Sequence, residues 1–201
     1  MEHYYSKKPS SKSDRKIIEA KIGGFKFKFV TDAGVFSKHK IDTGTEILIN
    51  AAQKTDFPSG NILDLGCGYG PIGLAIAKNF PERLIEMVDI NERSISLSKD
   101  NASRNKIENV KIYPSNIFDE VITKDFAGII SNPPIRAGKK IVHKMLEESY
   151  NHLIKDGKLQ IVIQRKQGAP SAKKKMEEVF GNVKRIDLEK GYWVLESVKT
   201  K

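Results

Sequence analysis

The residues best suited to chemistry lie in two short stretches, residues 61–73 and residues 131–140, and each contains or follows a short apolar run. The first reads Asn-Ile-Leu-Asp-Leu-Gly-Cys-Gly-Tyr-Gly-Pro-Ile-Gly, and the second reads Ser-Asn-Pro-Pro-Ile-Arg-Ala-Gly-Lys-Lys. A strand, a glycine turn and a helix in this order are typical of a nucleotide site beyond the carboxyl ends of the strands in an α/β sheet. An ordinary strand-to-helix turn is the alternative interpretation of the first stretch.

Two carboxylates narrow the kind of ligand that the glycine turn can take. Asp89 ends the next predicted strand, about 20 residues beyond the glycines, from where a carboxylate binds ribose hydroxyls. Asp64 stands just before Gly66, where a dinucleotide site would place a pyrophosphate. The pair favours a cofactor with a cationic end and no phosphate. A NAD-dependent oxidoreductase is the fold-level alternative, against which Asp64 and the lack of a Tyr-x-x-x-Lys pair after the fourth strand both weigh.

Cys67 is the only cysteine of the chain. It has no partner for a disulfide or for a thiolate metal site. We interpret it as a small residue that fits the turn rather than as a nucleophile, and we expect no metal.

The second stretch places Asn132, Pro133 and Pro134 directly after a predicted strand. The prolines hold the chain extended and remove two backbone donors. The Asn132 side-chain oxygen and the Pro133 carbonyl can then accept hydrogen bonds from a planar exocyclic amine. Two acceptors draw that nitrogen towards a tetrahedral shape as it attacks a methyl group, so positioning and a fixed hydrogen-bond field would supply most of the catalysis. A structural Asn-Pro turn is the alternative.

Strands and helices alternate around these residues. The apolar runs predict parallel strands at residues 62–65, 84–89, 110–113, 126–130 and 159–163, then an antiparallel pair at 185–188 and 192–198. Helical patterns cover residues 44–54, 92–105, 141–154 and 172–180, and a further helix begins at Pro71. Asp42 or Thr43 can cap the helix at 44–54. We expect an α/β fold with a seven-stranded, mostly parallel sheet and helices on both faces.

Charge is concentrated near the N-terminus. The chain of 201 residues carries a net charge of +10, and residues 1–40 hold ten Lys or Arg against four Asp or Glu. Residues 16–21 and 25–30 predict a hairpin joined at Gly23-Gly24. A basic balance of this size favours a polyanionic partner such as nucleic acid, with a surface kept basic for solubility as the alternative.

Composition sets the class of protein. With 39% hydrophobic and 30% charged residues, the sequence predicts one soluble domain with a short extension. Its longest apolar runs are too short for a membrane span, and its N-terminus lacks the apolar core of a secretory signal. A cytoplasmic location is therefore expected.

The glycine stretch resembles the first motif of the S-adenosyl-L-methionine-dependent class I methyltransferases. Asn-Pro-Pro is similar to the motif of those members that act on amine or amide nitrogens. The segments Asp-Ala-Gly-Val-Phe-Ser from Asp32 and Asp-Thr-Gly-Thr from Asp42 extend the likeness to the small-subunit ribosomal RNA guanine-N2 methyltransferase C family. The likeness covers about residues 15–200, nearly the whole chain, and is greatest to the short, single-domain members.

This resemblance implies a Rossmann-like fold and S-adenosyl-L-methionine as the cofactor. It implies catalytic roles for Asn132, Pro133 and Pro134. The implied cofactor-binding residues are Phe36, Thr43, Gly44, Asp64, Leu65, Gly66, Cys67, Gly68, Gly70, Asp89, Ile90, Asn116, Ile117 and Asn132. Residues 41–201 would form the methyltransferase domain, and residues 1–40 a basic arm and hairpin extension packed on it.

The implied substrate is a guanine N2 in ribosomal RNA or the small ribosomal subunit, bound by a monomer or weak dimer. The residues expected to contact RNA are Lys7, Lys8, Arg136, Lys139, Lys140, Arg165 and Lys166. Ile135 departs from the family, because many relatives place there an aromatic residue that stacks on the target base. The alternatives are methylation of a protein glutamine or small amine, and a cofactor-binding ribosome-assembly factor with little turnover.

Overall fold

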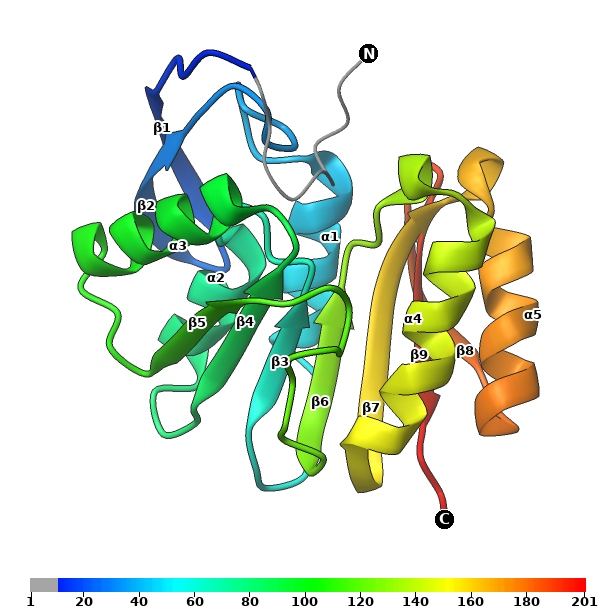
Figure 1. The fold of residues 1–201 in the computed structure, drawn as a ribbon. Helices are drawn as coiled ribbons and strands as arrows, with labels where there is room; N and C mark the ends of the chain where they lie inside the picture. Colours follow the sequence, from blue (N-terminus) through cyan, green and yellow to red (C-terminus); the bar gives the residue numbers. More distant parts are fainter. Residues whose placement is uncertain (1–10) are drawn as a thin grey trace.

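A seven-stranded sheet forms the centre of the structure, a computed structural model that describes residues 11–201 (Figure 1). The strands lie in the order β5-β4-β3-β6-β7-β9-β8. Their bounds are Ile62–Leu65 (β3), Ile85–Asp89 (β4), Val110–Pro114 (β5), Phe126–Ser131 (β6), Leu153–Gln164 (β7), Lys184–Glu189 (β8) and Tyr192–Val198 (β9). Neighbouring strands pair in parallel except that β9 runs antiparallel to both of its neighbours. The predicted mostly parallel sheet with a final antiparallel pair is confirmed.

Helices cover both faces of this sheet and bury a separate apolar core on each. The helices are Thr43–Ala52 (α1), Pro71–Asn79 (α2), Glu92–Arg104 (α3), Lys139–His152 (α4) and Ala169–Phe180 (α5), with 3-10 turns at Ile135–Ala137 (η1) and Arg165–Gln167 (η2). One core joins α1, α2 and α3 to the sheet, and the other joins α4 and α5 to its opposite face. Figure 1 shows α4 and α5 side by side near β7 and β9.

The central strand β3 explains why the glycine turn lies where it does. All four of its residues are buried, as expected for a strand that is covered on both faces. It pairs with β4 on one side and β6 on the other. Because parallel strands end at the same edge, Gly66, Asp89 and Asn132 all begin loops at that edge.

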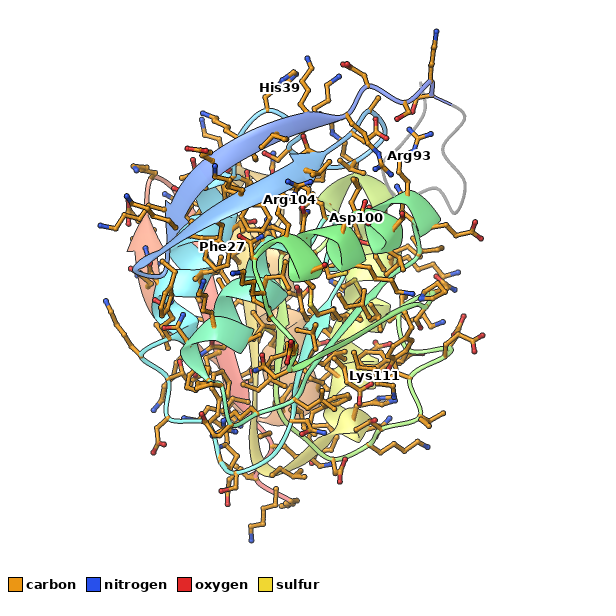
Figure 2. The ribbon with its side chains drawn as sticks, turned by 90° about the vertical axis from the view of Figure 1, so that its left-hand side faces the viewer. Phe27, His39, Arg93, Asp100, Arg104 and Lys111 are labelled. Carbon is orange, nitrogen blue, oxygen red and sulfur yellow. The ribbon has the colours of Figure 1, made fainter. Side chains whose placement is uncertain are left out.

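The N-terminal hairpin packs on α3 (Figure 2). Its strands β1, Lys16–Ile22, and β2, Phe25–Thr31, pair in an antiparallel register. Phe27 and Phe29 enter the same core as α2 and α3, while Lys26 and Lys28 stay exposed. The predicted alternation of a buried and a basic face is confirmed. The division of the chain at residue 40 stays a prediction, because nothing in the fold tests it.

One stretch differs from the sequence prediction. Helix α4 ends at His152 rather than near 154, and β7 begins at once with Leu153, which pairs with Phe126. Leu153 has an extended backbone and joins the sheet, so the helix cannot continue through it. Further along β7, Asp156 has a φ of 64° and its amide donates to the Lys199 carbonyl at 2.7 Å. Contacts with β6 and with the C-terminal segment thus hold this stretch in the sheet beyond its apolar run.

Among residues 11–201, no helix is both long enough and apolar enough to cross a bilayer.

Candidate functional site

A cavity of about 380 Å³ lies beyond the carboxyl ends of β3, β4, β5 and β6. It brings together most of the residues that the sequence singled out. Those lining it from the expected cofactor set are Phe36, Leu65, Gly66, Cys67, Gly68, Asp89, Ile90, Asn116, Ile117 and Asn132, joined by Pro133 and Pro134. The two chemical stretches therefore face one space.

Four residues of the expected cofactor set do not line this cavity: Thr43, Gly44, Asp64 and Gly70. Gly44 instead lets α1 approach β9, because a Cβ there would lie 2.8 Å from the Tyr192 ring. Asp42 and Thr45, which flank the expected pair, do line the cavity. Sequence reasoning used both as part of the Asp-Thr-Gly-Thr segment that carries the family likeness, and Asp42 as a possible helix cap, but gave neither a place at the site.

The glycine turn leaves its backbone open to a ligand. Gly66 and Gly68 have φ angles of 81° and 57°, which glycine adopts without strain. A Cβ on either residue would meet no atom of the described chain within 4 Å. A molecule in the cavity can therefore lie directly against this backbone.

Asp89 is tied to the turn from the other side. Its Oδ2 accepts the Gly68 amide at 2.8 Å, and its Oδ1 accepts the Asn91 amide at 2.8 Å. Burial raises its pKa to about 6. Each carboxylate oxygen keeps a second lone pair, so Asp89 can still accept from a hydroxyl in the cavity.

Asp64 lies beneath the turn. Its Oδ2 accepts the Gly73 amide at 2.7 Å, in the first turn of α2. Its Oδ1 is buried and accepts no hydrogen bond from the described residues. Burial, reinforced by the negative charge of Asp89, raises the pKa of Asp64 to about 7. A buried carboxylate oxygen with unused acceptor capacity suits an ammonium group, which it would bind directly or through water.

Polar residues of α3 hold the glycine turn in place, and sequence reasoning missed them. Ser98 Oγ donates to the Gly68 carbonyl at 2.8 Å. Asn101 Nδ2 donates to the Tyr69 carbonyl at 2.9 Å and to the Val30 carbonyl at 3.0 Å, while its Oδ1 accepts the Val30 amide at 2.7 Å. The available signal was the helical spacing of Ser94, Ser98 and Asn101 on the face of α3 that turns inward.

The loop before α1 is anchored by Asp32. Its carboxylate accepts the Asp14 and Ala33 amides and the Ser13 hydroxyl, and it lies 3.8 Å from the Arg93 guanidinium. Burial favours protonation of Asp32, but these hydrogen bonds and Arg93 outweigh it and hold the pKa of Asp32 below its ordinary value. The start of the loop is thereby fixed to α3.

The same loop places Phe36 at the cavity. Asn91 caps α3 with its side-chain oxygen, and its Nδ2 donates to the Gly34 carbonyl at 3.0 Å. Phe36, two residues further on, is 40% exposed and lines the cavity. The loop therefore brings a partly exposed aromatic ring to the cavity.

Asn132 is held by two acceptors on α1. Its Nδ2 donates to Asp42 Oδ2 at 3.1 Å and to Thr45 Oγ1 at 3.0 Å. Because a carboxylate can only accept, the amide nitrogen must face Asp42. The oxygen, Oδ1, accepts no hydrogen bond within the part of the chain that the structure describes and is left for the cavity.

The backbone after Asn132 turns sharply. The Ala137 amide donates to the Pro134 carbonyl at 2.9 Å, so the 3-10 turn begins after Pro134. Ile135 does not line the cavity and packs against the core beneath α4. The aromatic residues that do line the cavity are Phe36 and Tyr69.

Basic residues follow the ends of β6 and β7. Arg136, Lys139 and Lys140 are exposed around η1 and the start of α4, and Arg165 and Lys166 are exposed in η2. Among the described residues, the last four make no ion pair. Lys7 and Lys8 lie outside the described residues.

Comparison with known proteins identifies similar sequences. The model of the methyltransferase small domain family matches residues 26–196. The uncharacterized protein YbxB of Bacillus subtilis (strain 168) is 49% identical over 98% of both chains. The ribosomal RNA small subunit methyltransferase C of Psychromonas ingrahamii is 36% identical over 66% of this chain but only 38% of its own length. The chain thus spans about two fifths of that relative.

A solved structure shares the fold. It is the T. thermophilus 16S rRNA N2 G1207 methyltransferase (RsmC), determined in complex with AdoMet and guanosine. The two superimpose with a TM-score of 0.82 at 22% identity, over 92% of this chain and 50% of the T. thermophilus chain. At this identity the likeness shows the fold.

Proposed function

This chain belongs to the methyltransferase small domain family, and from this premise we propose that it methylates the exocyclic N2 of a guanine in RNA of the small ribosomal subunit. The family match confirms the predicted S-adenosyl-L-methionine-dependent methyltransferase and its cofactor. The sheet order confirms the predicted Rossmann-like fold. The nitrogen that is methylated and the RNA that carries it are the proposal.

The observation that carries the proposal is the orientation of Asn132. Its nitrogen is engaged by Asp42 and Thr45, so its oxygen is the atom presented to the cavity. An acceptor at this point, with the Pro133 carbonyl beside it, would bind the two hydrogens of a planar amine. Those bonds localise the nitrogen lone pair for attack, and no strong general base is needed because the nitrogen becomes acidic once it is methylated.

The residues around the glycine turn fit the cofactor. Asp89, which lines the cavity, would bind its ribose hydroxyls. Asp64, which lies beneath the turn and does not line the cavity, would reach its ammonium end through water. Asn116 and Ile117, after β5, would hold the adenine edge and ring. Bound there, S-adenosyl-L-methionine supplies an electrophilic methyl group on a sulfonium. The protein's own contribution is to orient the amine and to exclude water.

Ribosomal RNA is favoured as substrate by the names of the relatives and by charge. Lys139, Lys140, Arg165 and Lys166, which form no ion pair within residues 11–201, lie at the same edge of the sheet as Asn132, where they can bind backbone phosphates. Arg136 stands among them. A base in a duplex must leave its stack to reach Asn132. Phe36 offers the aromatic face for that base which Ile135 does not.

The test is transfer of a labelled methyl group to small ribosomal subunits, free ribosomal RNA and total protein, with the digested nucleosides and amino acids separated afterwards. We expect the label in N2-methylguanosine, and its absence when Asn132→Ala replaces the native enzyme. Label in glutamine or in a small amine would replace the proposal with the alternative substrates. Cofactor binding without any transfer would favour an assembly factor with little turnover.

A further inference from the structure

One carboxylate oxygen at the start of α1, Asp42 Oδ2, accepts two hydrogen bonds. Asp42 Oδ2 accepts the Thr45 amide at 3.1 Å, which caps the helix, and it accepts Asn132 Nδ2 at 3.1 Å. Thr45 Oγ1 receives the same nitrogen at 3.0 Å. Two residues of one helix turn therefore hold an amide that lies about ninety positions later in the chain.

Packing fixes the position of this helix turn. Thr45 is 3% exposed, and Gly44 sits against the Tyr192 ring of β9 so closely that a Cβ would approach it to 2.8 Å. The same Cβ would lie 3.0 Å from Asp42 Oδ2. Glycine at 44 thus lets the start of α1 pack closely on β9 with the Asp42 carboxylate beside it.

The charge of Asp42 is felt inside the site. Burial raises the pKa of the Tyr69 phenol, and the nearby Asp42 carboxylate raises it further. The pKa of Tyr192 is raised by the same two causes in the same order. The Asp42 carboxylate thus lies near Tyr69, a residue of the cavity lining, and is in direct contact with Asn132.

We propose that Asp42 and Thr45 are positioning residues for methyl transfer, which hold the Asn132 amide in the single orientation that presents Oδ1 to the substrate amine. A side-chain amide has two orientations of nearly equal shape. If Asn132 turned over, its donor nitrogen would face the hydrogens of the substrate amine and repel them. The carboxylate also polarises the amide through a charge-assisted hydrogen bond, which makes Oδ1 a stronger acceptor.

This inference rests on the proposed function, in which Asn132 Oδ1 accepts from the substrate. The rival explanation is that Asp42 and Thr45 serve only to cap and pack α1. The two explanations differ in what they expect from the Thr45 hydroxyl, because the cap uses the Thr45 backbone amide and not its side chain.

The experiment compares Thr45→Val with Thr45→Ser. Valine keeps the shape of threonine and removes the acceptor, whereas serine restores an oxygen. Thr55→Val is the matched control, because Thr55 lies three residues beyond the end of α1, outside the cavity, and its hydroxyl likewise accepts a side-chain amide, that of Gln160 at 2.6 Å. Asp42→Asn removes the charge and keeps an oxygen that can cap the helix.

The readouts are kcat, the KM for S-adenosyl-L-methionine, and the exchange rate with water of the Asn132 side-chain amide protons, measured by NMR and assigned with Asn132→Ala. We expect Thr45→Val and Asp42→Asn each to lower kcat by about tenfold, the equivalent of one hydrogen bond, with KM changed by less than about twofold. Amide exchange should quicken in both. Thr45→Ser should recover activity relative to Thr45→Val, and Thr55→Val should change neither kcat nor Asn132 exchange.

An unchanged kcat in both variants, or a loss in Thr45→Ser equal to that in Thr45→Val, would overturn the inference. The amide measurement needs no RNA, so it separates this inference from the proposed function. Faster Asn132 exchange in Thr45→Val, with no methylation of ribosomal RNA by the native enzyme, would leave the positioning intact and remove the proposed substrate. If the native enzyme methylates guanine N2 but Asn132 amide exchange is unchanged in Thr45→Val, the proposed function would stand and the positioning role would fall.

Discussion

The glycine-turn side of the cavity and the Asn132 side differ in how fully their polar groups are bonded within the protein. On the glycine side, both Asp89 oxygens accept backbone amides, and the Gly68 and Tyr69 carbonyls accept side chains of α3. Asp64 Oδ1 is the buried carboxylate oxygen there that accepts nothing from the described residues.

On the Asn132 side, the chain leaves acceptors and cations directed outward. Asn132 keeps Oδ1 for the cavity, and Lys139, Lys140, Arg165 and Lys166 make no ion pair among residues 11–201. The proposed function needs this difference, with a prebuilt side for the small cofactor and an open side for a large anionic partner. Variants on the two sides should therefore fail in different ways.

The largest effect should come from Asn132→Ala. The substitution removes the Oδ1 acceptor from the Asn132 side of the cavity. We therefore expect kcat to fall by about 10²–10³, the cost of one well-placed polar group in an active site. The Kd for S-adenosyl-L-methionine should stay within about twofold, since the glycine side is untouched. Calorimetry and methyl-transfer rates measure the two quantities. Asn79→Ala, at the end of α2, is the control, and a parallel loss of cofactor affinity would contradict the separation of the two sides.

Asn101→Ala should destabilise the protein at the glycine-turn side of the cavity. Asn101 is buried and bonds both Val30 and Tyr69, so its loss leaves three backbone groups without their partner. We expect the free energy of unfolding to fall by about 2–3 kcal/mol. Urea denaturation measures it.

Asn105→Ala is the matched variant for Asn101→Ala. Asn105 makes the same pair of bonds one turn later, to the Lys28 amide and carbonyl, but at the exposed end where water can replace them. A loss below about 1 kcal/mol is expected there. Equal losses in the two variants would show that burial is not what makes the Asn101 contacts important.

The raised pKa values of Asp64 and Asp89 predict that the free energy of unfolding depends on pH. Each folded-state pKa, about 7 and about 6, lies above the unfolded value near 4, so the folded state binds these protons more tightly. Their contribution to stability is therefore full below about pH 4 and is lost as pH rises through about 6–7. In the native protein, Asp64 should lower the free energy of unfolding by about 1–3 kcal/mol between pH 5 and pH 8.

Asp64→Asn isolates that contribution, because the amide keeps an acceptor for Gly73 and does not titrate. Denaturation at pH 5 and pH 8 should show a smaller difference for Asp64→Asn than for the native protein. An identical difference would mean that Asp64 titrates normally in the folded state.

The smallest effect should come from the exposed cations on the Asn132 side of the cavity. Replacing Lys139 and Lys140 together with alanine should weaken RNA binding a few-fold and reduce the salt dependence, by roughly 0.7 in log–log slope per lost contact to a single strand. Binding titrations at several salt concentrations measure both. Lys173 and Lys174, exposed on α5, are a matched pair whose replacement should leave the slope unchanged. Equal effects of the two pairs would point to diffuse attraction rather than to a binding edge.

Much of the fold was predictable because it depends on local patterns. Gly66, Gly68 and Gly70 have positive φ angles, which glycine adopts readily, and Pro71 suits the first position of α2. The alternating Phe27 and Phe29 predicted the buried side of the hairpin. The end of α4 was missed, because the pairing of Leu153 with Phe126 and the bond from Asp156 to Lys199 join segments that are far apart in the chain.

The site was predictable only in part, for the same reason. Residues near the strand ends, such as Asp89, Asn116 and Asn132, were identified because parallel strands end together. Thr43 and Gly44 were expected at the cavity, but Asp42 and Thr45 line it instead. Gly44 packs on Tyr192 of β9, a contact between distant segments that no local pattern encodes.

By itself, the sequence determined the order of strands and helices, the glycine turn, the acid before it and the Asn-Pro-Pro segment, because each follows from neighbouring residues. Only the tertiary structure decided that Asp64 points beneath α2, that Asn101 joins the hairpin to the glycine turn, and that Asp42 orients Asn132. These contacts join residues that are distant in sequence. They exist because sheet register and helix packing set which side chains meet, and no local pattern encodes that choice.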